Sequence, residues 1–152
     1  MSGTETISPI KVAVTVAVSP ERAWEVFTAQ MADWWPLHTH SIAAFAGGVP
    51  DRLVLEPGVG GEIYEEAGGL RRHWAKIDGW EPPNRLSYTW HVNPENPPTN
   101  VTVTFEPVDG GTRVEIVHSG WEAYADAGVT RASYGSTGGW ELVAASFASA
   151  LD

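Results

Sequence analysis

Apolar residues recur at every third or fourth position through the last part of the chain, from Val129 to Leu151. One face of a helix has this spacing, so the stretch predicts a long C-terminal helix. Gly138 and Gly139 lie inside it, and each weakens a helix by about 1 kcal/mol relative to alanine. Either the glycines break the helix, or its backbone lies too close to another element for side chains to fit. The apolar face continues in phase across the pair, which favours the close approach.

The N-terminal part predicts a strand followed by a helix. Branched apolar residues alternate with small or polar ones from Ile10 to Val18, a pattern typical of a β-strand. Ser19 is suited to cap a helix and Pro20 to occupy its first position, so a helix should begin there. It should end near Asp33 to Pro36, because proline disfavours helical geometry in the residue before it.

Short extended segments separated by glycine and proline turns fill the middle of the chain. A short helical turn around Ile42 to Phe45 precedes them, and Asp109-Gly110-Gly111 is a typical signal for a tight hairpin between the last two. The order of elements predicts an α+β fold, with a curved antiparallel sheet of about six to seven strands around the C-terminal helix. The expected strands after the first are Arg52 to Glu56, Gly61 to Glu66, Leu70 to Trp80, Arg85 to Val92, Asn100 to Pro107 and Arg113 to His118.

Residues two apart in a strand share a face, so the alternation predicts which side chains point inward. Leu86, Tyr88 and Trp90 should face the C-terminal helix, and so should His118 at the end of its own inward row. His118 is either a histidine with protein hydrogen-bond partners near the sheet rim, or a polar anchor for a ligand. The hydroxyl of Tyr88 has the same two interpretations.

The strand from Leu70 to Trp80 is less decisive, because two tryptophans share one of its faces and two apolar residues the other. We expect His73, Ala75 and Ile77 to face inward. This choice leaves the two tryptophans on the outer face.

Composition narrows the classes of function. The chain has 152 residues, which predicts one domain over residues 1–152, and no cysteine, which excludes disulfides and thiol chemistry. A net charge of −10 with nine Lys and Arg argues against nucleic acid and anionic membranes as partners. No apolar run is long enough for a membrane span, and the polar Met1 to Thr6 lacks a signal pattern, so we expect a cytoplasmic protein. The eight tryptophans predict an aromatic core. A minority of these tryptophans could line a pocket.

Candidate catalytic and metal-binding motifs are few. No nucleophile motif, phosphate loop or dinucleotide fingerprint is present. His38 and His40 form the only close histidine pair, and without a third ligand at suitable spacing a polar loop at a pocket mouth is favoured over a metal site. Glu65 and Glu66 should face opposite sides of their strand. An inward glutamate could act as a base, but a rim position bonded to a nearby arginine is favoured. No catalytic residue, metal or cofactor is therefore predicted.

Several segments form a set whose order is more specific than any one of them. They are Ser19 to Phe27, Trp34-Trp35-Pro36, Gly60 to Glu65, Pro83 to Leu86 leading to Trp90, Gly110 to Val114, His118 to Trp121, and Gly139-Trp140. This set resembles the activator of heat-shock protein 90 ATPase homologue-like family, within the START-like or SRPBCC superfamily. The resemblance implies the helix-grip fold shared with birch-pollen allergen, with one or two short helices after the first strand. It also implies a cavity for an apolar or aromatic small molecule.

The resemblance predicts that the protein binds such a molecule between the sheet and the C-terminal helix. One alternative is an enzyme of the cyclase, aromatase or hydrolase kind acting on that ligand, with His118 or an inward glutamate as acid or base. Another is a chaperone-related interaction module, and a homodimer is hinted at by the tryptophan surplus. The residues expected to line the ligand site are Trp35, His40, Phe45, Tyr64, His73, Tyr88, Trp90, His118, Trp140 and Phe147.

Overall fold

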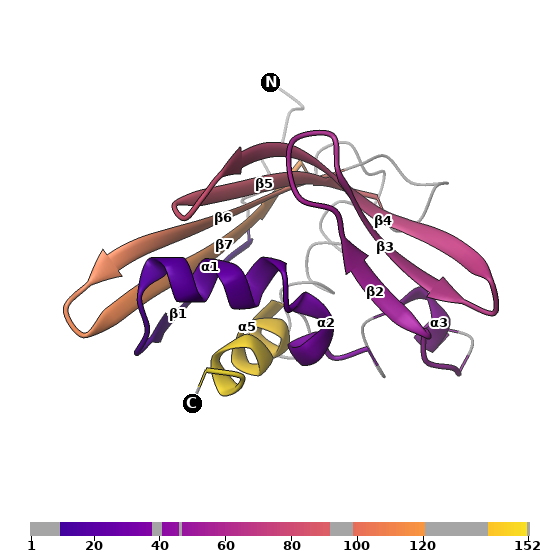
Figure 1. The fold of residues 1–152 in the computed structure, drawn as a ribbon, viewed down its shortest axis with the longest axis horizontal. Coiled ribbons are helices and arrows are strands. Elements are labelled where there is room, and N and C mark those ends of the chain that lie inside the picture. Colours follow the sequence, from indigo (N-terminus) through magenta and orange to yellow (C-terminus); the bar gives the residue numbers. More distant parts are fainter. Residues whose placement is uncertain (1–9, 38–40, 46, 92–98, 121–139, 152) are drawn as a thin grey trace, which may run out of the picture.

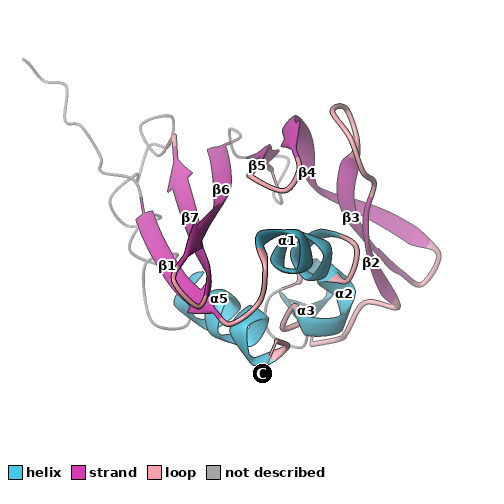
Figure 2. Cartoon of the chain, turned by 60° about the vertical axis from the view of Figure 1, so that its left-hand side comes forward, coloured by secondary structure: helices cyan, strands magenta, loops and turns pink. Residues whose placement is uncertain are grey.

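A curved antiparallel sheet forms the body of the protein, with the helices on its concave side (Figure 1, Figure 2). The structure is a computed structural model that describes residues 10–37, 41–45, 47–91, 99–120 and 140–151. Seven strands lie in the order β1-β7-β6-β5-β4-β3-β2, which confirms the expected α+β, helix-grip-like fold. The elements are β1 (Ile10–Val16), α1 (Pro20–Thr28), α2 (Met31–Trp34), α3 (Ile42–Phe45), β2 (Arg52–Leu55), β3 (Glu62–Ala67), β4 (Leu70–Glu81), β5 (Arg85–Trp90), β6 (Thr99–Val108), β7 (Gly111–Ser119) and α5 (Trp140–Ser149).

The start of α1 is the one that the sequence predicts. The hydroxyl of Ser19 accepts a hydrogen bond from the backbone N–H of Arg22, and Pro20 occupies the first helical position. Ala23, Trp24, Val26 and Phe27 are buried, so one face of α1 packs into the concavity of the sheet.

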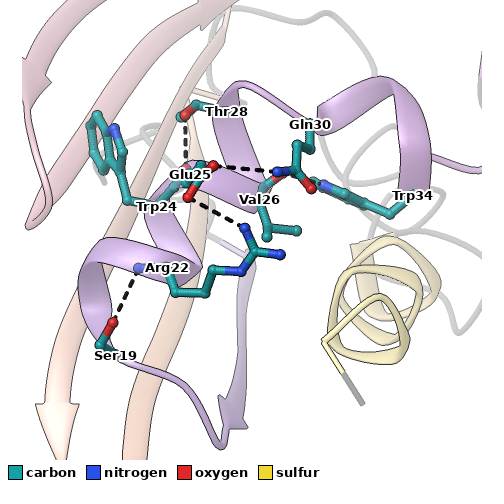
Figure 3. A network of polar contacts seen from close by, with 8 residues as sticks. All are labelled: Ser19, Arg22, Trp24, Glu25, Val26, Thr28, Gln30 and Trp34. Carbon is teal, nitrogen blue, oxygen red and sulfur yellow. Dashed lines mark hydrogen bonds and ion pairs between the residues drawn. The ribbon is translucent and has the colours of Figure 1, made fainter.

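The helix ends earlier than predicted, and a second short helix, α2, follows it. Side chains donate hydrogen bonds to two of the last backbone carbonyls of α1 (Figure 3). The hydroxyl of Thr28 donates to the carbonyl of Trp24 at 2.7 Å, and the indole of Trp34 donates to the carbonyl of Val26 at 2.8 Å. In a continuous helix the Val26 carbonyl would accept from the amide of Gln30, which instead bonds to the carbonyl of Glu25. The chain therefore turns before it restarts as α2.

A register shift in β4 corrects the predicted facing of that strand. Ile63 of β3 is paired with Ala75, whereas the next residue, Tyr64, is paired with His73, so Trp74 is an extra residue in β4. Trp74 and Ala75 consequently both reach the core, where Ile77 joins them. His73, which was expected to face inward, lies on the opposite face with 38% of its side chain exposed. The prediction for Ala75 and Ile77 is confirmed and that for His73 is wrong.

The core fills the space between the sheet and the helices, and it is unusually aromatic. Phe27 packs against Trp34, Phe105 and Phe147 with ring centroids between 5.1 and 5.7 Å apart. This group joins α1, α2, β6 and α5. The buried tryptophans are Trp24, Trp34, Trp35, Trp74, Trp90 and Trp140.

The C-terminal helix α5 begins at Trp140 and buries Val143, Ala144 and Phe147. The predicted segment from Val129 to Gly139 lies outside the described residues, so the effect of the two glycines stays a prediction. None of the helices in the described part of the chain is long and apolar enough to span a membrane.

Candidate functional site

Four tryptophans from four different parts of the chain meet on the concave face of the sheet, beside the start of α5. Trp35 follows α2, Trp74 lies in β4, Trp90 ends β5 and Trp140 begins α5. The ring centroid of Trp35 lies 5.2, 6.2 and 6.0 Å from those of Trp74, Trp90 and Trp140, respectively. Trp90 and Trp140 are 5.6 Å apart. This four-tryptophan cluster is a buried, largely apolar group of rings, each between 1% and 7% exposed.

His118 lies next to the cluster, fully buried, and uses both ring nitrogens within the protein. The indole of Trp140 donates to its Nδ1 at 2.8 Å, and its Nε2 lies 2.6 Å from the hydroxyl oxygen of Thr99. Because an indole N–H only donates, Nδ1 is the acceptor, and the proton of the neutral ring is on Nε2. Burial lowers the pKa of His118 from 6.5 to about 3, so the ring is neutral near pH 7.

This arrangement favours the first interpretation of His118, a histidine with protein hydrogen-bond partners. The side chain has satisfied partners on two sides, and it orients the first residue of α5 against the end of β7. A neutral ring with both nitrogens engaged is a poor general acid or base. His118 is thus a positioning residue for Trp140 in the described structure.

Tyr88, in the middle of β5, differs from His118 in one respect. Its side chain is 1% exposed, and its hydroxyl oxygen Oη has no hydrogen-bond partner among the described residues. Burial raises the pKa of the Tyr88 hydroxyl above its usual range, so the group keeps its proton and can donate it. The ring centroid lies 6.1 Å from that of Trp90. A buried polar group without a partner is uncommon in proteins and costs about 1–3 kcal/mol, so Tyr88 marks a place where a polar partner is lacking.

Glu65 is a charged residue of the core, although the sequence favoured a position at the rim of the sheet. Its side chain is fully buried. Its Oε1 accepts a hydrogen bond from the indole of Trp74 at 2.7 Å, and its Oε2 accepts from the backbone N–H of Ala43 at 3.0 Å. The carboxylate of β3 therefore links the backbone of α3 to a side chain of β4. The sequence did carry a signal for this position, because Glu65 is two residues from the core residue Ile63 in β3 and so shares its face.

The neighbouring Glu66 lies on the outer face, as the adjacent-residue argument predicts. It forms two hydrogen bonds with Arg52, each at 2.9 Å, and lies 4.0 Å from Arg71. The hydrogen bonds from Arg52 lower the pKa of the Glu66 carboxyl. This exposed ion pair is a surface feature of β2 and β3.

The structure brings together part of the predicted ligand-binding set. Trp35, Trp90, His118 and Trp140 lie in or against the four-tryptophan cluster, and Tyr88 adjoins it. Phe147 is buried nearby and contacts the cluster through Trp34.

Tyr64 and His73 do not join this set. Both belong to the outer face of the sheet, where the guanidinium of Arg71 lies 3.9 Å from the centroid of the Tyr64 ring and His73 lies 3.4 Å from Glu62. His40 and the side chain of Phe45 lie outside the described residues, as does His38. Within the described residues no group of three or more metal-ligating side chains comes together.

Comparison with known proteins shows which family the sequence matches. The sequence profile of the family described as activator of Hsp90 ATPase homolog 1-like protein matches residues 17–152. No curated protein matches the sequence significantly. Among solved structures, a protein from Rhodobacter sphaeroides shares 23% identity over 98% of this chain and 95% of its own, with a TM-score of 0.70.

Two further structures add a functional and an assembly context. The anthrahydroquino-γ-pyrone synthase Txn09 is 34% identical over 96% of this chain and 98% of its own, with a TM-score of 0.63. The Aha1 dimer from Colwellia psychrerythraea is 17% identical over 95% and 96% of the two chains, with a TM-score of 0.65. The likeness to the Rhodobacter and Colwellia proteins concerns the fold. With the family profile matching nearly the whole sequence, the chain belongs to the activator of Hsp90 ATPase homolog 1-like family.

Proposed function

We propose that this protein binds an apolar or aromatic small molecule against the concave face of its sheet, with the hydroxyl of Tyr88 as the hydrogen-bond donor to it. The observation that carries the proposal is the buried Oη of Tyr88, which has no hydrogen-bond partner within the part of the chain that the structure describes. A ligand carbonyl or hydroxyl oxygen would supply that partner. The four-tryptophan cluster would supply the apolar contact.

The chemistry of the surrounding side chains favours a neutral ligand. His118 is neutral near pH 7 because its pKa is lowered by burial. Burial of an aromatic ligand at roughly 25 cal/mol per Å² gives useful affinity before any hydrogen bond forms. A flat aromatic molecule with one oxygen aimed at Tyr88 fits these conditions.

The 34% identity to Txn09 supports a polycyclic aromatic ligand, because that relative is a synthase of an anthrahydroquino-γ-pyrone. It also supports a second candidate, an enzyme that converts such a compound. In that case the Tyr88 hydroxyl would be the group that donates a proton or a hydrogen bond to the reacting oxygen. His118 would not be the acid or base, since both of its nitrogens have protein partners.

A titration with danthron, a neutral dihydroxyanthraquinone, tests the binding proposal through quenching of tryptophan fluorescence. Tyr88→Phe should weaken binding by about three- to tenfold, the loss of one hydrogen bond. Tyr64→Phe is the matched control, because it removes the same hydroxyl from the outer face of the sheet. Absence of danthron binding to the unmodified protein, or equal affinity for the Tyr88→Phe variant, would contradict the proposal.

Mass spectrometry separates binding from turnover. With oxygen excluded, since oxygen alone oxidises an anthrahydroquinone, a binding protein returns the added compound unchanged. An enzyme changes its mass or retention, and Tyr88→Phe then lowers the rate. The cytoplasmic location remains a prediction from the sequence, and the chaperone-related interaction module remains an alternative function. The dimeric Colwellia relative supports a homodimer, which light scattering on the purified protein would test.

A further inference from the structure

We propose that a cleft beside α1 is a second binding site, independent of Tyr88, which takes an organic cation with a quaternary or alkylated ammonium group. This α1 cleft is lined by Trp24, Glu25, Thr28, Ala29, Leu55, Pro57 and Trp80. Four of these residues, from Trp24 to Ala29, belong to α1 or directly follow it.

The α1 cleft has the size and the lining of a small-molecule site. Its volume is about 440 Å³, within the range usual for ligand pockets. The rings of Trp24 and Trp80 meet edge to face, with centroids 4.9 Å apart and an angle of 74° between their planes. Leu55 and Pro57 add two aliphatic side chains to the lining. The cleft therefore presents two indoles and two aliphatic side chains to an occupant.

The charge of the cleft favours a cation. Glu25 is the only ionisable residue in its lining, and neither Lys nor Arg is among the lining residues. Arg22 and the Glu25 carboxylate form an ion pair (Figure 3). Their nitrogen–oxygen distance is 3.3 Å, and both side chains are about half exposed. Exposed ion pairs of this kind contribute little, so a ligand cation can compete for the carboxylate.

The indoles provide the second reason for a cation. The π-face of tryptophan attracts ammonium groups more strongly than that of the other aromatic side chains, and quaternary ammonium ligands are recognised in this way. An anion would face the Glu25 carboxylate, while a neutral ligand would use only the apolar part of the lining. The net charge of −10 adds attraction for cations over the whole molecule.

Choline and its neutral isostere, in which a tert-butyl group replaces the trimethylammonium group, test the proposal. The readout is the set of indole N–H signals in nitrogen-15 NMR spectra, assigned by Trp→Phe variants. Choline should shift the signals of Trp24 and Trp80 and bind about three- to thirty-fold more tightly than the isostere. Glu25→Gln should weaken choline binding about two- to fivefold. Glu21→Gln removes the same charge from an exposed position of α1 outside the cleft, and it should leave the affinity unchanged.

Three outcomes would overturn the proposal. The first is no shift up to about 100 mM choline, far above a millimolar dissociation constant. The second is equal affinity for choline and the isostere, or equal effects of the Glu25 and Glu21 substitutions. The third is a shift confined to Trp90 and Trp140, which would locate choline at the four-tryptophan cluster. Tyr88→Phe should not change choline binding, so this test is distinct from that of the danthron site.

Discussion

The indole N–H of Trp140 donates a hydrogen bond to Nδ1 of His118, with 2.8 Å between the two nitrogens. This bond joins the first residue of α5 to the end of β7, and both side chains are buried. It exists only while Nδ1 carries no proton. The attachment of the C-terminal helix to the sheet is therefore sensitive to the protonation of one histidine.

Stability should depend on pH through His118. The pKa of His118 is about 3 in the folded protein and 6.5 when unperturbed, so between these values the unfolded state binds more protons. The free energy of unfolding attributable to His118 is fully present above pH 6.5, and it falls as the pH drops toward 3, by about 1.4 kcal/mol per pH unit. Urea denaturation at several pH values would measure it.

His118→Gln is the control for this titration, because its amide oxygen can accept from Trp140 and its amide N–H can donate to Thr99 without titrating. The difference in unfolding free energy between the unmodified protein and this variant should decrease below pH 6.5. A difference that stays constant down to pH about 4.5 would show that His118 is not held neutral in the folded state.

Removal of the Tyr88 hydroxyl should stabilise the ligand-free protein. The Oη is buried and none of the described residues bonds to it, so Tyr88→Phe should relieve a desolvation penalty of about 1–2 kcal/mol. Thermal unfolding would show the midpoint rising in this variant, even though danthron binding is expected to weaken. A fall in the midpoint would mean that the hydroxyl already has a stabilising partner.

Glu65→Gln should destabilise the fold although it changes the shape of the side chain very little. Trp74 and the amide of Ala43 both donate to the carboxylate, and a glutamine can accept only with its oxygen. One donor would then face the amide NH₂, at a cost of about 1–3 kcal/mol. Glu66→Gln, on the exposed face beside Arg52, should cost much less, because exposed ion pairs contribute little to stability. Equal urea midpoints for the two variants would contradict the account of Glu65.

Adjacent glycines of the β6–β7 hairpin should respond differently to alanine. Gly110 has a φ of +82° and open space around it, so Gly110→Ala should cost about 1–2 kcal/mol of backbone strain. A Cβ on Gly111 would collide with the backbone carbonyl of Val16 in β1, which cannot move without disturbing the β1–β7 pairing. Gly111→Ala should therefore destabilise more than Gly110→Ala in urea unfolding, and the reverse order would be inconsistent with the close approach.

Much of the fold was predictable because alternation and helical spacing are local signals. The strands from Arg52 to Ser119 and the start of α1 followed from such patterns. The facing of His73 did not, because the extra residue at Trp74 is visible only when β3 is paired with β4. One inserted residue reverses which side chains face the core.

The polar part of the site was harder to predict, because its contacts join distant parts of the sequence. His118 forms hydrogen bonds with Thr99, nineteen residues before it, and with Trp140, twenty-two residues after it. From alternation alone its inward orientation was clear, but not the use of both ring nitrogens. Likewise, the lack of a partner for Tyr88 is a property of the packed interior, which composition and spacing do not encode.

Trp34 and Trp35 are neighbours in the chain whose ring centroids lie 5.7 Å apart but whose other contacts differ. Trp34 is bonded to the Val26 carbonyl of α1, whereas Trp35 lies within the four-tryptophan cluster. A ligand that displaces α1 would therefore act on Trp35 through the peptide bond and through the contact between the two rings. Occupants of the α1 cleft and of the danthron site should accordingly be linked, each altering the affinity of the other by the same factor.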